Sequence, residues 1–316
     1  MPPVPLVRVV RSGVEESVHL GSVVVADADG RILRKAGDPS RVAFARSSMK
    51  PLQAAVSLRL AAADPSDPEV AVMCASHNGE PVHVDAVTTL LRRAGLDEHR
   101  LQTPPDRPID PESASAVEEP RPIFHNCSGK HAGMLLASTE RGFDTGTYRD
   151  PDHPLQRAVL DTVEGAAGHR PEAIGVDGCG VPVHALPLAA LAKLYAALGA
   201  GRVDLAERVL AAMRAEPYLV AGRNRVCTAV MEAAPNVVVK TGAEGLMCAA
   251  ILDRGIGVAL KVEDGAARAA DPAIVRALAL IGTLDPDAVS GFARPPVLGG
   301  GRPVGHLEAS FHLPAA

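Results

Sequence analysis

The lysines of this chain are rare and stand beside small polar residues. There are 6 lysines against 26 arginines, so arginine supplies most of the fixed positive charge. Lysine, unlike arginine, can lose its proton near neutral pH when its surroundings lower its pKa. Three short patterns combine lysine or serine with small polar neighbours: Ser47-x-x-Lys50, Ser76-His77-Asn78 and Lys240-Thr241-Gly242. These are residue types that nucleophilic catalysis by a serine hydroxyl uses.

Ser47 and Lys50 are expected on the first turn of a helix that starts near Ser47. Residues three apart on a helix share a face, and Pro51 is tolerated only in a first turn. A desolvated lysine can take the proton of a serine, which is otherwise a poor nucleophile. Arg46 could bind a substrate carboxylate through two parallel hydrogen bonds. The alternative is a helix cap followed by a surface lysine, and Ser48 is a second candidate for the cap or the nucleophile.

Four further residues could complete such a site. Ser76 and Asn78 would add a hydroxyl and an amide, or they could simply end a helix at Gly79. Lys240 follows an apolar strand and could reinforce the positive field, or it could only mark the end of that strand. Lys261 ends another apolar strand, where a buried charge is costly, so it is either a surface residue or a base with an altered pKa. In this order the patterns resemble the acyl-transfer machinery of penicillin-recognising enzymes.

Two cysteine-containing segments carry the other candidate groups. Residues 125–131 and 177–184 are rich in small residues and are expected to be loops. Cys127 and Cys179, with nearby histidine or lysine nitrogens, could hold zinc, or each cysteine could be a compact buried filler. Asp177 follows a strand-like run and could receive the ammonium group of an amino-acid substrate.

The composition excludes several classes of partner. Of the 316 residues only 3% are aromatic and tryptophan is absent, which argues against a stacking surface for nucleic acid. The net charge of -5 without charged blocks argues against a DNA-binding or anionic-membrane surface. No signal peptide or membrane-spanning run is visible. The five scattered cysteines do not suggest disulfides, so we expect a cytoplasmic protein.

The pattern of elements predicts an α/β (α+β) chain in which strands gather at both ends. Strands are expected within residues 5–36 and near 173–177, 236–240, 246–253, 256–262 and 305–312. Helices are expected at 48–62, 68–75, 82–95, 153–164, 186–198, 203–215 and 272–282. A mostly antiparallel sheet built from both termini and flanked by helices fits this order. We expect one domain over residues 1–316, with a helical subregion at roughly 45–235 and a long loop at 101–122.

Five motifs together resemble the asparaginase II family of rhizobial type. They are Arg-Ser-x-x-Lys-Pro from Arg46, Cys-Ala-Ser-His-Asn-Gly-Glu from Cys74, His-Asn-Cys-Ser-Gly-Lys-His-Ala-Gly-Met from His125, Asp-Gly-Cys-Gly-Val-Pro from Asp177 and Lys-Thr-Gly-Ala-Glu-Gly from Lys240. The resemblance runs from about residue 10 to 312. It implies a fold like serine β-lactamases and glutaminases. It also implies hydrolysis of L-asparagine to L-aspartate and ammonia by a zinc-associated enzyme, for which we expect a homodimer.

The resemblance assigns roles to particular residues. Ser47 with Lys50 and Ser76 with Lys261 would form two catalytic pairs, and Ser47 is the preferred nucleophile. The zinc ligands would be Cys127, Lys130 and Cys179. The expected substrate-binding residues are Arg46, Asp177, His131 and Asn78.

Two other functions remain open at this point. One is another amidohydrolase with serine and lysine at its site, either a glutaminase or an enzyme that recognises β-lactams. The other is an inactive module that binds zinc or an amino acid. The presence of Ser47, Lys50, Ser76 and Lys261 argues against an inactive module, because an inactive site should have lost some of these residues.

Overall fold

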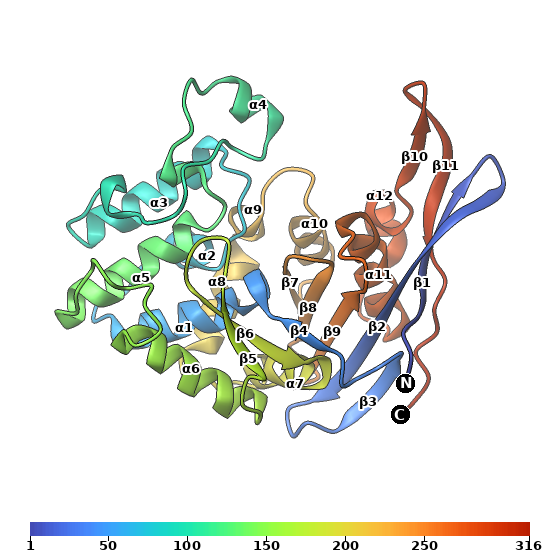
Figure 1. The fold of residues 1–316 in the computed structure, drawn as a ribbon, viewed down its shortest axis with the longest axis horizontal. Helices are drawn as coiled ribbons and strands as arrows, with labels where there is room; N and C mark the ends of the chain where they lie inside the picture. Colours follow the sequence, from blue (N-terminus) through green and yellow to red (C-terminus); the bar gives the residue numbers. More distant parts are fainter.

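The computed structural model describes all 316 residues and contains one large antiparallel sheet. Its strand order is β10-β11-β1-β2-β9-β8-β7, and β3 pairs with β2 beside this path. The strands are β1 (Val4–Arg11), β2 (Val14–Asp27), β3 (Ile32–Ala36), β7 (Val237–Thr241), β8 (Leu246–Ile251), β9 (Ile256–Val262), β10 (Pro296–Gly299) and β11 (Arg302–Ala309). The prediction of a mostly antiparallel sheet made from both ends of the chain is therefore confirmed, and Figure 1 shows both termini at this sheet.

Helices cover the centre of the sheet. Every residue of β9 is buried, and α7 (Leu188–Gly199) and α11 (Ala267–Leu280) both contact this strand. Gly257 in β9 lies directly against the backbone of α7 at Ala192 and Ala196. This close approach is possible because glycine has no side chain. The hairpins β1–β2 and β10–β11 extend away from the body instead (Figure 1).

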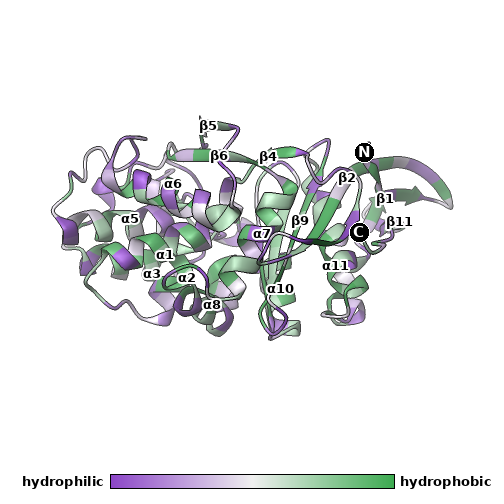
Figure 2. Ribbon diagram, turned by 90° about the horizontal axis from the view of Figure 1, so that it is seen from below, coloured by the Kyte–Doolittle hydropathy of each residue, from purple (hydrophilic) through white to green (hydrophobic).

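Most of the remaining helices form a separate layer beside the sheet (Figure 2). Residues 50–58 of α1 are all buried at its centre, where α1 contacts α5, α6 and α8. The helices are α1 (Lys50–Leu60), α2 (Asp67–Met73), α3 (Pro81–Arg93), α4 (Pro111–Ser115), α5 (Ser128–Arg141), α6 (Pro154–Ala167), α8 (Ala206–Ala215), α9 (Pro217–Val220), α10 (Val226–Ala233) and α12 (Ser290–Ala293), with short 3₁₀ turns at Arg46–Met49, Glu98–Arg100, Pro122–Phe124 and Pro286–Val289. None of the helices combines the length and apolar character that crossing a bilayer requires.

A small second sheet joins two segments of the expected site. Its order is β4-β6-β5, with β4 at Val42–Phe44, β5 at Ala173–Val176 and β6 at Pro182–Pro187. Arg46 follows β4 and Asp177 follows β5, so this sheet brings the two residues together. The sequence did not predict β4 or β6, because three- and six-residue strands at the edge of loops carry little periodicity.

The prediction that residues 125–131 form a loop is wrong for its second half. Ser128, Lys130 and His131 lie on the first turn of α5, and Cys127 is its N-cap residue. Two glycines near the start hid the helix, although the following Met-Leu-Leu-Ala run favours one. The predicted long loop at 101–122 contains the short helix α4 and an isolated bridge between Asp106 and Arg121.

Substituting Gly257 by alanine should destabilise the fold. The added methyl group would overlap the backbone of Ala192 and Ala196, so α7 must shift at a cost of about 1–3 kcal/mol. Gly165→Ala in α6 is the matched control, since nothing lies within 4 Å of its added methyl group. Chemical denaturation should show a loss for Gly257→Ala and an unchanged or raised stability for Gly165→Ala. Equal midpoints for the two variants would contradict this packing.

Candidate active site

The hydroxyl of Ser76 is held between two buried lysines. Lys50 Nζ lies 3.0 Å from Ser76 Oγ, and Lys240 Nζ lies 2.7 Å from the same oxygen. All three residues are at most 3% exposed. Ser76 follows α2, Lys50 opens α1 and Lys240 lies on β7, the sheet edge next to the helical layer. The site therefore forms where the helices meet the sheet.

Burial changes the acidity of both amines. Desolvation, together with the nearby charge of Lys50, lowers the pKa of Lys240 to about 7. Desolvation also lowers the pKa of Lys50. The negative charge of the Cys127 thiolate raises this pKa in part, but the net shift is downward. Lys50 Nζ also donates to the carbonyl of Ala75 at 2.5 Å. Because a charged amine is costly here, at least one of the two lysines is readily neutral and can accept a proton through Ser76.

Ser47 precedes Lys50 by three residues in the chain but is not hydrogen-bonded to Lys50 or Ser76. Its hydroxyl has no hydrogen bond, and the residue is only half buried. The neighbouring Ser48 is buried and its hydroxyl donates to the Ala45 carbonyl at 2.6 Å, which makes Ser48 a structural residue. Arg46 adopts the left-handed conformation with φ of 48°. The expected side-chain hydrogen bond between Ser47 and Lys50 is absent, and the Ser47 hydroxyl is left without a hydrogen-bond partner.

The predicted pairing of Ser76 with Lys261 is wrong. Lys261 Nζ donates to the carbonyl of Val262, and the charges acting on it include Glu263 and Arg41. Lys261 sits on β9, between β2 and β8 and away from the sheet edge. Lys240, which the sequence left without a firm role, takes its place on Ser76. The K-T-G pattern was the signal that could have made this assignment.

Arg46 and Asp177 form an ion pair. Arg46 Nε lies 2.5 Å from Asp177 Oδ1, with the Asp177 side chain 8% exposed. The backbone N–H of Gly178 donates to the same oxygen at 2.9 Å. The two residues predicted to bind opposite ends of an amino acid therefore neutralise each other in this structure.

Cys127, Lys130 and Cys179 meet as the sequence resemblance implied. Lys130 Nζ lies 2.9 Å from Cys179 Sγ, and a hydrogen bond from Cys179 lowers the pKa of Cys127 well below its ordinary value. Burial alone would lower the pKa of Lys130, but the charges of Cys179 and Cys127 outweigh it and raise the pKa. Lys50 borders this cluster, because the Cys127 charge acts on it.

Cys127, Lys130 and Cys179 offer three ligands to a thiophilic metal ion only if the lysine amine serves as one of them. No group of three or more His, Cys, Asp or Glu side chains could hold a metal ion. Two thiols and one lysine nitrogen do converge, and thiolate sulfur is a preferred zinc ligand. Lys130 would have to give up its proton to bind a metal, which makes such a site sensitive to pH.

His131 is fully buried behind this cluster. Its Nδ1 lies 2.7 Å from the Tyr148 hydroxyl, and its Nε2 has no hydrogen-bond partner. Burial lowers the pKa of His131 well below its ordinary value, so the ring is neutral. His131 Nε2 is therefore a buried nitrogen without a partner.

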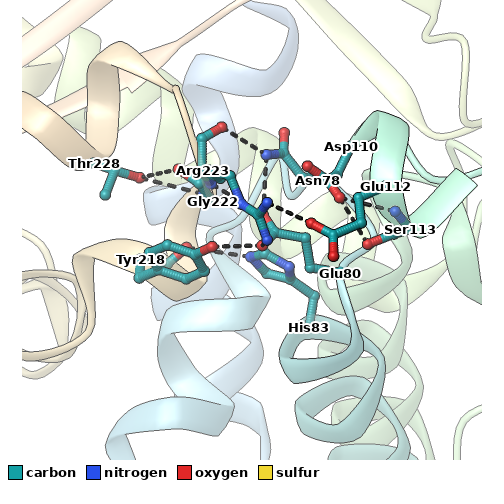
Figure 3. A network of polar contacts seen from close by, with 10 residues as sticks. All are labelled: Asn78, Glu80, His83, Asp110, Glu112, Ser113, Tyr218, Gly222, Arg223 and Thr228. Carbon is teal, nitrogen blue, oxygen red and sulfur yellow. Dashed lines mark hydrogen bonds and ion pairs between the residues drawn. The ribbon is translucent and has the colours of Figure 1, made fainter.

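Asn78 belongs to a polar network that ties three distant segments together (Figure 3). Its Nδ2 donates to Glu80 Oε1 at 3.1 Å and to the carbonyl of Arg223 at 2.9 Å. Glu80 also accepts from the Tyr218 hydroxyl, and Arg223 donates to Glu112 at 2.6 Å. The amide of Asn78 thus fixes the segment after Ser76 to the loop before α10. Glu80 was missed from the sequence, although it stands in the same Ser-His-Asn-Gly-Glu motif.

One comparison with known proteins identifies the family of this chain. A family model described as L-asparaginase II matches residues 7–309, nearly the whole chain. No curated protein matches. The solved structure of Mglu in its tris and glutamate form has a TM-score of 0.44 and 15% identity, over 82% of this chain and 58% of that chain. A β-lactamase from Mycobacterium bovis has a TM-score of 0.36 and 16% identity, over 84% of this chain and 95% of that chain.

Replacing Lys240 should damage amide hydrolysis far more than replacing Lys261. Lys240→Met removes one of the two amines on Ser76, and we expect a loss of about 100-fold or more in kcat. Lys261→Met is the matched control, because its amine contacts only a backbone carbonyl. Steady-state ammonia release should separate the variants once circular dichroism has shown that both are folded. A greater loss of kcat in Lys261→Met than in Lys240→Met would support the pairing of Ser76 with Lys261 instead.

The rate should fall on the acidic side of neutrality. A lysine must be neutral to take a proton, and burial lowers the pKa of Lys240 to about 7. The neutral form is therefore lost as the pH drops below about 7, and kcat/KM should decline there with an apparent pKa shared with Lys50. A profile measured between pH 5 and 9 tests this. A flat profile, or a limb near the ordinary pKa of lysine, would contradict it.

Proposed function

Because the chain belongs to the L-asparaginase II family, we propose that it hydrolyses the side-chain amide of L-asparagine to L-aspartate and ammonia. The observation that carries this proposal is the Ser76 hydroxyl held at 3.0 and 2.7 Å by two buried amines. Such an arrangement can accept and return the protons that serine-based amide hydrolysis requires at neutral pH. The match to the family over nearly the whole chain supports asparagine as the amide.

Ser47 is the proposed nucleophile. The residue is half buried and its hydroxyl is free of hydrogen bonds, whereas the Ser76 hydroxyl is held by two lysines. Ser47 Oγ attacks the amide carbon while Lys50 takes the hydroxyl proton. The tetrahedral intermediate collapses as Ser76 and Lys240 deliver a proton to the leaving nitrogen, which departs as ammonia. Water then attacks the aspartyl ester with the same groups reversing their roles, which releases aspartate and restores Ser47.

The ion pair of Arg46 and Asp177 binds the charged head group of the substrate in this proposal. Of the two residues, only Asp177 can receive the α-ammonium group. Arg46 holds the Asp177 carboxylate in place. His131 offers its unpartnered Nε2 as a further polar contact. Asn78 acts differently from the expectation, because its amide is already used by the loop before α10.

We further propose that Cys127, Lys130 and Cys179 hold one zinc ion. The lowered pKa of Cys127 supports this, because a thiolate is the ligand form. A bound zinc ion would supply positive charge that orients the substrate and the surrounding loops. All five cysteines are free, which fits the proposed cytoplasmic location, and we retain the homodimer as the proposed assembly.

L-Asparagine should be a much better substrate than L-glutamine. One additional methylene group changes transition-state binding by about 1–3 kcal/mol, or roughly 10- to 200-fold in kcat/KM. Ammonia release from the two amino acids measures this ratio, with a chromogenic cephalosporin as a third substrate. Equal values would leave an amidase of another specificity. Binding of asparagine without ammonia release would instead reveal an inactive binding module.

Cys127→Ala and Cys179→Ala should each lower the zinc content without unfolding the chain. Each change removes one of two soft ligands, and structural metal sites tolerate such losses poorly. Metal analysis of purified protein, with Cys74→Ala as a buried control outside the cluster, is the measurement. Zinc content that stays equal in all three variants would show that the two cysteines only fill space.

A further inference from the structure

His77 is the one residue of the Ser76-His77-Asn78 pattern to which the proposed mechanism gives no role. It follows Ser76 directly and is completely buried. The backbone N–H of Gly79 donates to His77 Nδ1 at 3.1 Å, so Nδ1 is unprotonated and the ring proton lies on Nε2. His77 is therefore a neutral imidazole with one directed donor.

This donor joins the Ser76 turn to the start of α5. His77 Nε2 lies 2.9 Å from Ser128 Oγ, and the Ser128 hydroxyl donates in turn to the Ile123 carbonyl at 2.8 Å. The backbone N–H of His77 also donates to the Asn126 carbonyl at 3.3 Å. His77 thus binds the residues around the start of α5 through both its side chain and its main chain.

The amine of Lys50 spans the same two segments. Its Nζ donates to the Ala75 carbonyl at 2.5 Å and lies 3.0 Å from Ser76 Oγ, both in the segment that carries His77. Its third acceptor is the Asn126 carbonyl at 3.3 Å, which is the oxygen that the His77 N–H also contacts. The separation of the two segments therefore sets the position of the Lys50 amine relative to the Ser76 hydroxyl.

The packing of α5 on α2 brings the segments close without fixing their alignment. A side chain at Gly129 would overlap the backbone of Val72, and one at Gly133 would overlap Met73, so the first turns of α5 lie directly on α2. Apolar packing of this kind is non-directional, whereas hydrogen bonds require a particular distance and angle. The alignment of the two segments therefore depends on the hydrogen bonds of His77.

We propose that His77 is a positioning residue for amide hydrolysis, an inference that rests on the proposed function. Its bond to Ser128 holds the Asn126 carbonyl in place. That carbonyl in turn holds the Lys50 amine beside the Ser76 hydroxyl. A misplacement of about 1 Å in a catalytic group can lower the rate by roughly 100-fold, so the effect of this link should be measurable in kcat.

Two substitutions of His77 separate the two ends of its ring. His77→Asn keeps an oxygen that can accept the Gly79 N–H two residues further on, but it is too short to reach Ser128. We expect its kcat for L-asparagine to fall by about 10- to 100-fold, with KM changed by less than about threefold. His77→Gln places an amide N–H near the position of Nε2 and should recover much of this loss.

A double-mutant cycle tests whether the bond to Ser128 is responsible. Ser128→Ala removes the acceptor, so the double variant with His77→Asn should be no slower than the slower single variant. Ser138→Ala is the matched control, because Ser138 is an equally buried serine of α5 whose hydroxyl donates within the helix, to the Met134 carbonyl. Losses of kcat that multiply in the double variant would contradict the proposal.

The ¹⁵N resonance of Lys50 Nζ, identified by its loss in Lys50→Met, reports on the amine independently of activity. It should move in His77→Asn and in Ser128→Ala, although neither change touches Lys50, and it should stay in place in Ser138→Ala. An unmoved resonance, or an unchanged kcat in folded His77→Asn, would overturn the proposal. If the wild type released no ammonia from asparagine, the proposed function would fail, and the Lys50 resonance would still decide whether His77 positions the amine.

Discussion

The chemistry of this protein depends on keeping amines in its interior. Lys50 and Lys240 are each 1% exposed, and both donate to the hydroxyl of Ser76. Removing an ammonium group from water is costly, so the fold favours the neutral amine that a serine nucleophile requires. A surface lysine with its ordinary pKa would stay charged at neutral pH and could not serve. Burial is therefore the source of the reactivity that we propose for this site.

The fold brings Lys50, Ser76 and Lys240 together from three separate elements. Lys50 comes from the most deeply buried helix, Ser76 from the turn after α2, and Lys240 from the edge strand of the main sheet. The small sheet β4-β6-β5 adds the pair of Arg46 and Asp177. Each element contributes one or two groups, so no local segment contains the site. A displacement of the helical layer from the sheet would separate Ser76 from Lys240.

The sequence allowed the broad fold to be predicted, because β-branched runs at both ends of the chain and alanine-rich runs in the middle have clear periodicities. It also located Ser76, Lys50 and the cysteine cluster, since each stands in a compact motif. It could not choose between Lys240 and Lys261. Both lysines end apolar strands, and only the strand order shows that β7 lies at the edge beside the helices while β9 lies inside the sheet. Register and strand order arise from long-range pairing that local patterns do not record.

The central claim is that Ser47 attacks the amide while Ser76 carries protons between Lys50 and Lys240. The most direct measurement is mass spectrometry of enzyme quenched in acid during turnover of L-asparagine, followed by peptide mapping. The account predicts one aspartyl group attached to Ser47, and no such group in Ser47→Ala. An aspartyl group on Ser76, or turnover without any acylated peptide in the wild-type enzyme, would contradict it.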